Sequence, residues 1–351
     1  MGSFSTRFLS FGFNSLGLAI TSTDYTKYAV NWGDGTFTIT KGLFLNSAFA
    51  NHDYAAGDYV IRINEHPQDL SVAPVFVTAS MHSDATTDLT ITGGRLQDMV
   101  LGGQADDVIR TGAGDDLVSG GDGNDMIYSN TGNEFIYGGG GDDRISGGDG
   151  EDDLEGGDGN DHIYGGAGND YLEGGAGDDV MHGNGGDDVI KDYDGGNNRM
   201  YGDDGNDELI GYLGNDMLFG GDGNDSLSGE RGNDTLSGGG GNDVLDGVGG
   251  SNRLTGGAGA DRFVFATLQE QKTTIKDFSS SDGDLVDLHY YGSSLKFVGT
   301  DHFSGDRGEV RYVQNGHGET LVRLDSDGDK HADLTIRLDG NHTLHASDFI
   351  L

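Results

Sequence analysis

Aspartate residues recur at intervals of nine through the middle of this 351-residue chain. Residues 93–264 divide into nineteen nine-residue units, with one extra residue in the unit 192–201. Sixteen of the units have Asp at position six: Asp98, Asp107, Asp116, Asp125, Asp143, Asp152, Asp161, Asp170, Asp179, Asp188, Asp207, Asp216, Asp225, Asp234, Asp243 and Asp261. Carboxylate and backbone carbonyl oxygens in flexible loops suit Ca²⁺ better than Mg²⁺. The spacing therefore predicts multiple Ca²⁺ ions held by these aspartates.

Two further columns of the repeat predict the elements that position the aspartates. Position eight is apolar in all nineteen units, and positions one, two and four are mostly Gly. Glycine permits the positive φ of a tight turn and lets carbonyl oxygens approach an ion, and an isolated apolar residue in a strand points to one face. We expect a six-residue turn and a three-residue strand per unit, two units per coil, and units n and n+2 stacked in an all-β parallel roll.

Electrostatic repulsion makes a cation necessary for such a roll. Stacked strands lie ~4.8 Å apart, which brings aspartates of successive coils to roughly 5 Å. Each pair then repels by about 3 kcal/mol at an effective dielectric constant of ~20, whereas each buried Leu or Ile returns only ~1.5–3 kcal/mol. The metal-free roll is therefore predicted to be unstable, and divalent ions between its turns reverse the balance.

The repeat resembles the RTX, or haemolysin-type, calcium-binding nonapeptide GGxGxDxUx, as in GGDGNDMIY (120–128) and GGDGNDSLS (220–228). The resemblance implies a right-handed parallel β-roll with Ca²⁺ held between neighbouring coils by the repeat Asp and by carbonyls. A solvated Gly/Asp-rich linker does not explain nineteen apolar residues at position eight. No Gly-Lys-[Ser/Thr] phosphate loop occurs in the sequence.

Several units depart from the pattern, and we expect weak or empty sites there. The units 93–101 and 102–110 lack the fourth Gly, and 129–137 lacks the first two and has Glu134 at position six. Position six is Asn252 in one unit, and Asn197 or Asn198 in the unit with the extra residue, where a bulge would divide the roll into two blocks. We expect about a dozen occupied sites.

Residues 265–351 have fewer glycines and alternating strand-like runs, such as EVRYVQ and LTIRLD. Together with the transition at 256–288, they resemble the C-terminal domain of serralysin-type secreted metalloproteases. The resemblance implies a β-rich cap on the roll and an uncleaved C-terminal signal for type I secretion, which ends in an acidic residue followed by hydrophobic ones. Residues 348–351, DFIL, fit that ending.

A second acidic loop, DSDGDKHAD, has spacing that partly resembles an EF-hand. Lys330 stands where the invariant Gly of that loop belongs, and Ile336 where the bidentate Glu belongs. A cation site and a solvated acidic turn both remain open for it. Its candidate ligands are Asp325, Asp327, Asp329 and Asp333. The acidic residues nearest the last coil, Asp277, Asp282 and Asp284, are candidates for capping it.

Residues 1–92 carry far fewer acids and are predicted to form a separate domain. The runs YAVNWGDGTFTI (28–39) and HDYAAGDYVIRI (52–63) resemble a PKD-like β-sandwich, a module that serves as a spacer or a weak binder of carbohydrate or protein. Trp32 is expected in its core. The extreme N-terminus has one Arg before an interrupted apolar stretch with no small-residue cleavage site, so no cleaved signal is predicted.

Composition and missing motifs exclude several classes of function. The net charge of −40 excludes a nucleic-acid binder that works by phosphate neutralisation, and the absence of Cys excludes disulfides and thiolate sites. No stretch of 18 apolar residues occurs, so no membrane span is predicted. Neither HExxH nor GxSxG occurs. We therefore expect a non-enzymatic chain.

The sequence thus predicts a secreted, extracellular protein that binds Ca²⁺ and folds when it takes up the ion outside the cell. Its expected partners are calcium ions and the type I secretion machinery, and an extracellular glycan or surface protein is a further candidate. Two alternatives remain. The chain is the non-catalytic portion of a secreted protease, lipase or polysaccharide-modifying enzyme, or it is an adhesin or matrix component.

Overall fold

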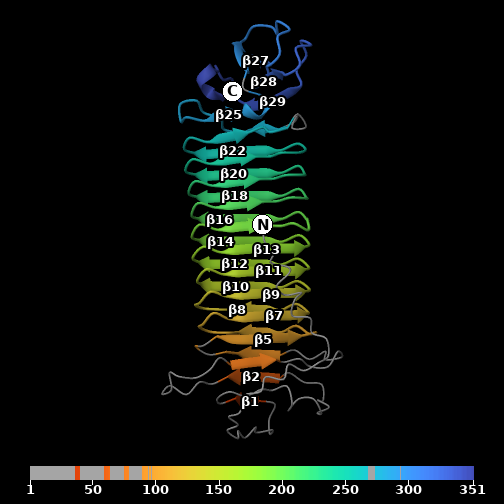
Figure 1. Ribbon diagram of the computed structural model, residues 1–351, viewed down its shortest axis with the longest axis vertical. Helices are drawn as coiled ribbons and strands as arrows, with labels where there is room; N and C mark the ends of the chain where they lie inside the picture. The colour runs from red at the N-terminus through yellow and green to blue at the C-terminus, as the bar shows by residue number, and fades with distance from the viewer. Residues whose placement is uncertain are drawn as a thin grey trace.

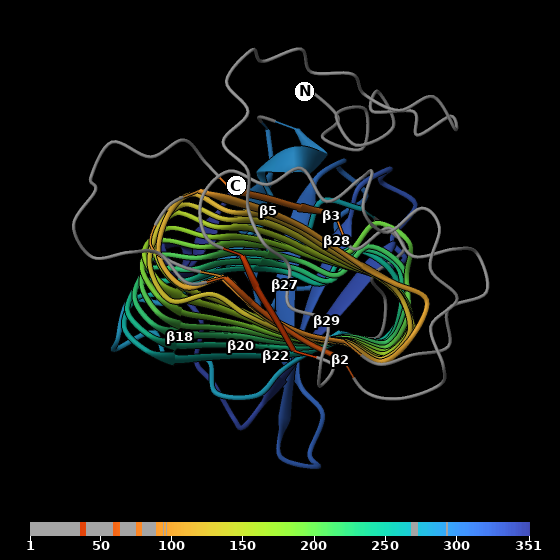
Figure 2. The same cartoon turned by 90° about the horizontal axis from the view of Figure 1, so that it is seen from below.

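A computed structural model describes residues 36–39, 59–63, 75–78, 89–93, 95, 97–267, 273–292 and 294–351. In this part of the chain the backbone winds into a tall stack of coils, seen from the side in Figure 1 and along the stack in Figure 2. Each coil of the repeat contributes one strand to each of two sheets. The predicted all-β parallel roll is confirmed.

Sheet 1 is the larger of the two and has seventeen strands. All neighbours are parallel from its first strand through β24, which is followed by β29, β28, β27 and β26. Its strands are β1 (Thr36–Ile39), β2 (Tyr59–Ile63), β4 (Leu89–Thr92), β6 (Val108–Arg110), β8 (Met126–Tyr128), β10 (Arg144–Asp149), β12 (His162–Ala167), β14 (Val180–Gly185), β16 (Arg199–Asp204), β18 (Met217–Asp222), β20 (Thr235–Gly240), β22 (Arg253–Ala258), β24 (Thr274–Ile275), β26 (Lys296–Gly299), β27 (Glu309–Gln314), β28 (Glu319–Asp325) and β29 (Leu334–Asp339).

Sheet 2 has thirteen strands in chain order. They are β3 (Val75–Thr78), β5 (Asp98–Gly103), β7 (Leu117–Asp122), β9 (Phe135–Gly140), β11 (Asp153–Asp158), β13 (Tyr171–Ala176), β15 (Val189–Lys191), β17 (Glu208–Ile210), β19 (Ser226–Ser228), β21 (Val244–Asp246), β23 (Arg262–Val264), β25 (Leu285–Asp287) and β30 (Phe349–Ile350).

Units n and n+2 stack in register, as the repeat predicts. Leu154 of β11 lies opposite Leu172 of β13, at the same position of the unit two places on. Many strands have six residues rather than the predicted three, because positions one to three of the next unit continue the ladder: Gly157 pairs with Gly175 in the same two strands. The turn therefore shrinks to positions four to six.

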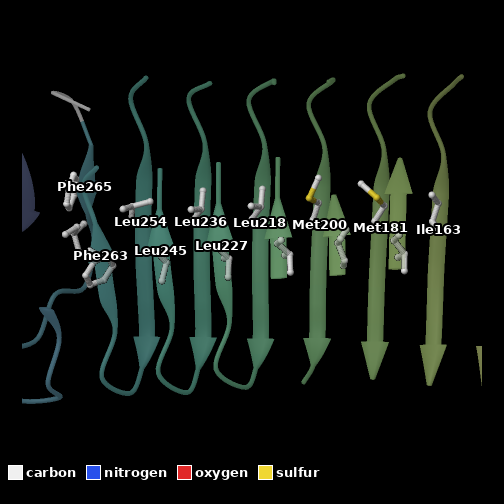
Figure 3. Close-up of a cluster of buried hydrophobic side chains, with 14 of the residues drawn as sticks. Ile163, Met181, Met200, Leu218, Leu227, Leu236, Leu245, Leu254, Phe263 and Phe265 are labelled. Atoms are coloured by element: carbon white, nitrogen blue, oxygen red, sulfur yellow. The ribbon is translucent and has the colours of Figure 1, made fainter. Parts of the chain in front are cut away.

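The core is a column of position-eight side chains enclosed between the two sheets. Every position-eight residue from Val100 to Phe263 has at most 1% of its surface exposed. Figure 3 shows Leu218, Leu236 and Leu254 from one sheet alongside Leu227 and Leu245 from the other. The column is one side chain deep per strand, so each coil depends on its neighbours for burial.

The extra residue near Asp192 does not interrupt either sheet. Met181 of β14 pairs with Met200 of β16, and Ile190 of β15 pairs with Leu209 of β17. The prediction of a bulge that divides the roll into two blocks is therefore wrong. The additional residue is absorbed in the loop 192–198, because the loop lies outside the ladder while the apolar column fixes the register on both sides.

The described strands before residue 93 continue the two sheets of the roll. The pairs β1–β2 and β2–β4 are parallel, β4 pairs with β6, and β3 pairs with β5. Ile91 is fully buried and extends the core column by one coil. This parallel stacking differs from the separate β-sandwich expected for 1–92. Residues 28–35 and 52–58, with Trp32 and most of the PKD-like motif, lie outside the described residues.

A β-rich cap covers the C-terminal end of the roll (Figure 1). Strands β27, β28 and β29 form an antiparallel meander that joins sheet 1 through β24. Two short 3-10 helices, η2 (His289–Tyr291) and η3 (Ala346–Asp348), flank the last strand. That strand, β30, pairs with β25 and completes sheet 2. No helix among the described residues is long and apolar enough to cross a membrane.

Candidate metal centres

The position-six aspartates lie where the turns of successive coils stack, and each one binds the coil before it. The Oδ1 atom of Asp125 accepts a hydrogen bond from the backbone N–H of Asp107 at 2.7 Å, and Oδ1 of Asp143 accepts one from Asp125 at 2.7 Å. The same bond recurs at 2.7–3.0 Å along both edges of the roll. From Asp116 to Asp261, one carboxylate oxygen of each repeat aspartate is therefore engaged in a hydrogen bond to the coil before it.

The other carboxylate oxygen is buried, and at most of these aspartates it has no hydrogen-bond partner among the described residues. Twelve aspartates share this orphaned Oδ2: Asp125, Asp143, Asp161, Asp170, Asp179, Asp188, Asp207, Asp216, Asp225, Asp234, Asp243 and Asp261. The Oδ2 atoms of Asp116 and Asp152 also lack a hydrogen bond, with Thr111 and Glu134 nearby. A buried, unpaired carboxylate oxygen is costly unless a cation compensates it.

Glycine makes room for these oxygens. A Cβ atom on Gly120, at position one, would lie 2.1 Å from Oδ2 of Asp125. At position two, Gly121 has φ +119, and a Cβ there would lie 2.0 Å from the carbonyl oxygen of Gly103 in the coil before. Carboxylate and carbonyl oxygens thus occupy space that a side chain would fill. A cradle of hard oxygen donors fits Ca²⁺.

Burial raises the pKa of most of these carboxyl groups. It raises the pKa of Asp125 to about 8, that of Asp161 to about 7 and that of Asp143 to about 6, although the backbone hydrogen bond to each opposes the shift. The position-six aspartates linked by these hydrogen bonds form a ladder along the roll, and neighbours in the same ladder further raise the pKa of Asp125 and Asp161. Without a cation, the fold therefore favours protonated carboxyl groups over ionised ones.

The departures from the repeat keep their places in the ladder. Asp98 and Asp107 donate their N–H groups to Asp116 and Asp125, as regular units do. The N–H of Glu134 donates to Oδ1 of Asp152 at 2.9 Å. Burial is the first cause that raises the pKa of Glu134 to about 9, and the neighbouring Asp152 adds to it.

In the unit with the extra residue, Asn198 takes the position of the repeat Asp. Its Oδ1 accepts the N–H of Asp179 at 2.8 Å, and its own N–H donates to Asp216 at 2.9 Å. Asn197 precedes it in the turn and accepts the N–H of Asn215 at 3.1 Å. The sequence alone did not decide which of the two, Asn197 or Asn198, stands at position six.

Position five forms a second ladder, which the sequence analysis missed. Its exposed Asn or Asp side chain accepts the N–H of the position-five residue one coil later, as Asn206 does from Asn224 at 3.0 Å. In six rungs the side-chain amide of the later residue, an Asn, donates to the same oxygen, at 3.1 Å for Asn224. The signal in the sequence was the Asn or Asp before most repeat aspartates, as in GNDMIY and GNDHIY. This ladder holds the turns together without an ion.

The loop after β28 brings three of its four candidate ligands together. One carboxylate oxygen each from Asp325, Asp327 and Asp333 lies within 4.8 Å of the others, whereas the carboxylate of Asp329 accepts the N–H of His331. Both oxygens of Asp325 accept backbone N–H groups, from Gly328 and Lys330. These bonds form a capped acidic turn, so the assignment of a cation to this loop stays a prediction.

Two of the three acidic residues proposed to cap the roll do so. Asp277 accepts the N–H groups of Gly256 and Gly257 through its two oxygens, at 3.0 and 2.9 Å. Oδ1 of Asp284 accepts the N–H of Asp261 at 3.0 Å and so adds a final rung to the ladder. Asp282 has its N–H bonded to Ser279 within the capping loop.

Comparison with known proteins agrees with this geometry. The family model described as RTX calcium-binding nonapeptide repeat (4 copies) matches residues 92–127, 128–163, 155–190, 192–227, 219–253 and 237–264. No curated protein matches the chain.

Two similar solved structures are subunits of the Azotobacter vinelandii mannuronan C5-epimerase. The AlgE6R3 subunit is 24% identical with a TM-score of 0.28, over 43% of this chain and 76% of that one. The AlgE6R2 subunit is 22% identical with a TM-score of 0.24, over 51% and 90%. Taking the family match and the donor set together, the roll of this chain is built of RTX calcium-binding nonapeptide repeats, and the cofactor of its coils is Ca²⁺.

Proposed function

We propose that this chain is a secreted module that leaves the cell unfolded and folds outside it when Ca²⁺ binds. The observation that carries the proposal is the row of twelve buried Oδ2 atoms without a protein partner in the described coils. In their ionised form they oppose folding, and a divalent ion between coils turns the same atoms into ligands.

The concentration of free calcium then acts as the switch. Extracellular modules bind Ca²⁺ with dissociation constants of about 10⁻⁴–10⁻³ M, well above the free Ca²⁺ of a cytosol. A chain with such sites stays unfolded inside the cell and fills them outside.

The test is a far-UV circular dichroism titration of the full chain. In a chelator we expect little β-structure, and on addition of millimolar Ca²⁺ a cooperative gain of it. Mg²⁺ at the same concentration serves as the control and is expected to give less structure, because it demands a rigid octahedral site. A spectrum that is the same with chelator and with Ca²⁺ refutes the proposal.

A second role concerns positions seven and nine on the outward face of sheet 1; in the same strands, Asp203 pairs with His182 at 3.0 Å. In the described strands β6 to β22, positions seven and nine of this face carry no Asp or Glu. Arg144, Arg199 and Arg253 are exposed and lie in one register row, three strands apart. The corresponding strands of sheet 2 carry acids such as Glu155 and Glu173.

Aromatic side chains fill the row beside these arginines. The rings of Tyr164, His182, Tyr201 and Phe219 stack with centroids 5.3, 4.3 and 4.9 Å apart. The guanidinium of Arg144 lies 4.8 Å from the ring centre of Tyr164. Guanidinium groups bind carboxylates in a bidentate manner, and tyrosine hydroxyls donate and accept hydrogen bonds. The face offers both kinds of contact along a straight row.

We propose that this face binds a linear acidic polysaccharide. Arginines three strands apart are separated by about 14 Å, which suits a polymer with one carboxylate per sugar better than a nucleic acid, whose duplex carries one charge per ~1.7 Å. The role agrees with a module of a secreted polysaccharide-modifying enzyme or of an adhesin.

The test compares a triple variant with a control away from the face. We expect Arg144→Ser, Arg199→Ser and Arg253→Ser together to abolish calorimetric binding of polygalacturonate to the Ca²⁺-loaded chain, and Arg231→Ser to leave it unchanged. Neutral dextran is expected not to bind. Equal binding by the triple variant, or binding of DNA in place of polygalacturonate, contradicts the proposal.

A further inference from the structure

Not every side chain at position six has a carboxylate oxygen without a hydrogen-bond partner. Asn252 stands at position six of the unit 247–255 and makes the ladder bond of a repeat Asp, since its Oδ1 accepts the N–H of Asp234 at 2.8 Å. Its Nδ2 occupies the place of the orphaned oxygen. A Cβ on Gly247 would lie 2.4 Å from this nitrogen, just as a Cβ on Gly238 would lie 2.1 Å from Oδ2 of Asp243.

The amide of Asn252 satisfies the acceptors that surround it. Nδ2 donates to the carbonyl oxygens of Gly247 at 2.7 Å and Gly249 at 2.8 Å, positions one and three of its own unit. A carboxylate oxygen at the same place has no hydrogen to donate when it is ionised. The carbonyl oxygens of the turn thus need a hydrogen-bond donor, and in the unit 247–255 the side-chain amide of Asn252 is that donor.

The unit with the extra residue is closed by the same kind of group. Nδ2 of Asn198 donates to Oδ2 of Asp192. The carboxylate of Asp192 in turn accepts the N–H groups of Asp194 and Gly195, at 3.1 and 3.3 Å. Asn198, like Asn252, is absent from the group of residues with orphaned oxygens.

The other ladder of position-six hydrogen bonds ends at Asp284, where both carboxylate oxygens have protein donors. Oδ1 of Asp284 accepts the N–H of Asp261, and its Oδ2 accepts the N–H of Ser279 at 2.7 Å. Asn252 is the last position six of its own ladder, and Asn198 marks the extra residue. Protein groups therefore satisfy the position-six side chain in the unit with the extra residue and at the two places where the ladders end.

From this pattern we infer that the turns closed by Asn198, Asn252 and Asp284 hold no calcium, and that ions are confined to turns with an orphaned carboxylate oxygen. The inference rests on the calcium-dependent folding proposed above and assigns it to particular coils. The amide-closed turns are rigid without the ion, so they mark the coils that form at the lowest calcium concentration.

The experiment exchanges the two kinds of position six within one ladder. We expect Asn252→Asp to bind one more Ca²⁺ per chain than the wild type, and the matched variant Asp234→Asn to bind one fewer, as counted by elemental analysis after gel filtration in Ca²⁺. The midpoint calcium concentration for folding is expected to rise in Asn252→Asp and to fall in Asp234→Asn. An unchanged ion count in a folded Asn252→Asp overturns the inference.

The Asp234→Asn variant decides the matter if Asn252→Asp does not fold. Loss of one ion with a lower folding midpoint supports the inference, and retention of the wild-type count overturns it. Failure of the proposed function has a different signature, because the wild type is then folded in chelator and binds no calcium. In that case the melting temperature in chelator still compares an amide with a carboxylate at position six. A higher melting temperature for Asp234→Asn than for the wild type supports the inference that an amide closes the turn, and an unchanged one refutes it.

Discussion

At the scale of single residues, each repeat aspartate has two separate tasks. One oxygen closes a hydrogen bond to the coil before it, and the other faces the site of the ion. Asp170 is a regular example: its Oδ1 accepts the N–H of Asp152 at 2.8 Å, and its Oδ2 is orphaned. Substitutions at one position can separate the two tasks.

We expect Asp170→Ala to destabilise the Ca²⁺-loaded chain more than Asp170→Asn. Both lose a metal ligand, but the alanine also leaves the buried N–H of Asp152 without an acceptor, which costs a further ~1–3 kcal/mol. Chemical denaturation at saturating Ca²⁺ measures the difference. Equal destabilisation by the two variants would mean that the ladder bond contributes nothing.

Gly120, at position one, is predicted to be hard to replace beside the orphaned oxygen of Asp125. Gly120→Ala puts a methyl group 2.1 Å from Oδ2 of Asp125, and we expect it to lower stability by about 1–3 kcal/mol, as overpacking does, and to weaken Ca²⁺ binding. The control is Gly140→Ala, where the nearest atom lies 3.8 Å from the new Cβ. Thermal melting in Ca²⁺ distinguishes the pair, and an equal loss in both would count against the cradle.

Protons are expected to substitute partly for calcium. Because burial raises the pKa of Asp125 to about 8 and that of Asp161 to about 7, the metal-free fold holds protons that the unfolded chain releases near pH 4. This stability is present below about pH 4 and is lost as the pH rises through about 6 to 8. In chelator, circular dichroism should therefore report more β-structure at pH 4.5 than at pH 8. The opposite trend would contradict the burial of unpaired carboxylates.

At the scale of the strand and its coil, the apolar column is the fully buried hydrophobic contact that the described units of the repeat share. Leu172 has no exposed surface and lies in register with Leu154 and Ile190. We expect Leu172→Ala to cost about 2–5 kcal/mol in the Ca²⁺-loaded chain, measured by denaturation. Met126→Ala, at a side chain that is 47% exposed, is the control and is expected to change little.

What the sequence predicted follows from how strictly each column is repeated. Positions one, six and eight are nearly invariant, so the coil and the core were predictable, whereas the assignment of the position-six aspartates as ligands stays a prediction. Strands β1 to β4 were not, because segments such as Thr36–Ile39 and Leu89–Thr92 stack on the roll without the Asp and Gly of the repeat. The role of Asn252 was equally hidden, since only the directions of its hydrogen bonds distinguish an amide-closed turn from a metal site.

At the scale of the whole molecule, the roll is a one-dimensional stack in which each coil contacts only its neighbours. The two sheets run without a break from the first described strands to the cap, where β30 completes sheet 2 (Figure 1). The orphaned carboxylate oxygens and the column of apolar side chains follow the same stack of coils. We therefore expect filling of one site to favour formation of the next coil and folding to be cooperative in calcium.

The central claim is that ion uptake and folding are one event. Equilibrium dialysis and far-UV circular dichroism, measured on the same samples across a calcium titration from chelator to millimolar Ca²⁺, test it most directly. The account predicts that the fraction of bound ions and the fraction of β-structure rise together on one steep curve. A compact, protease-resistant chain in chelator, or full β-structure before any ion is bound, would contradict it.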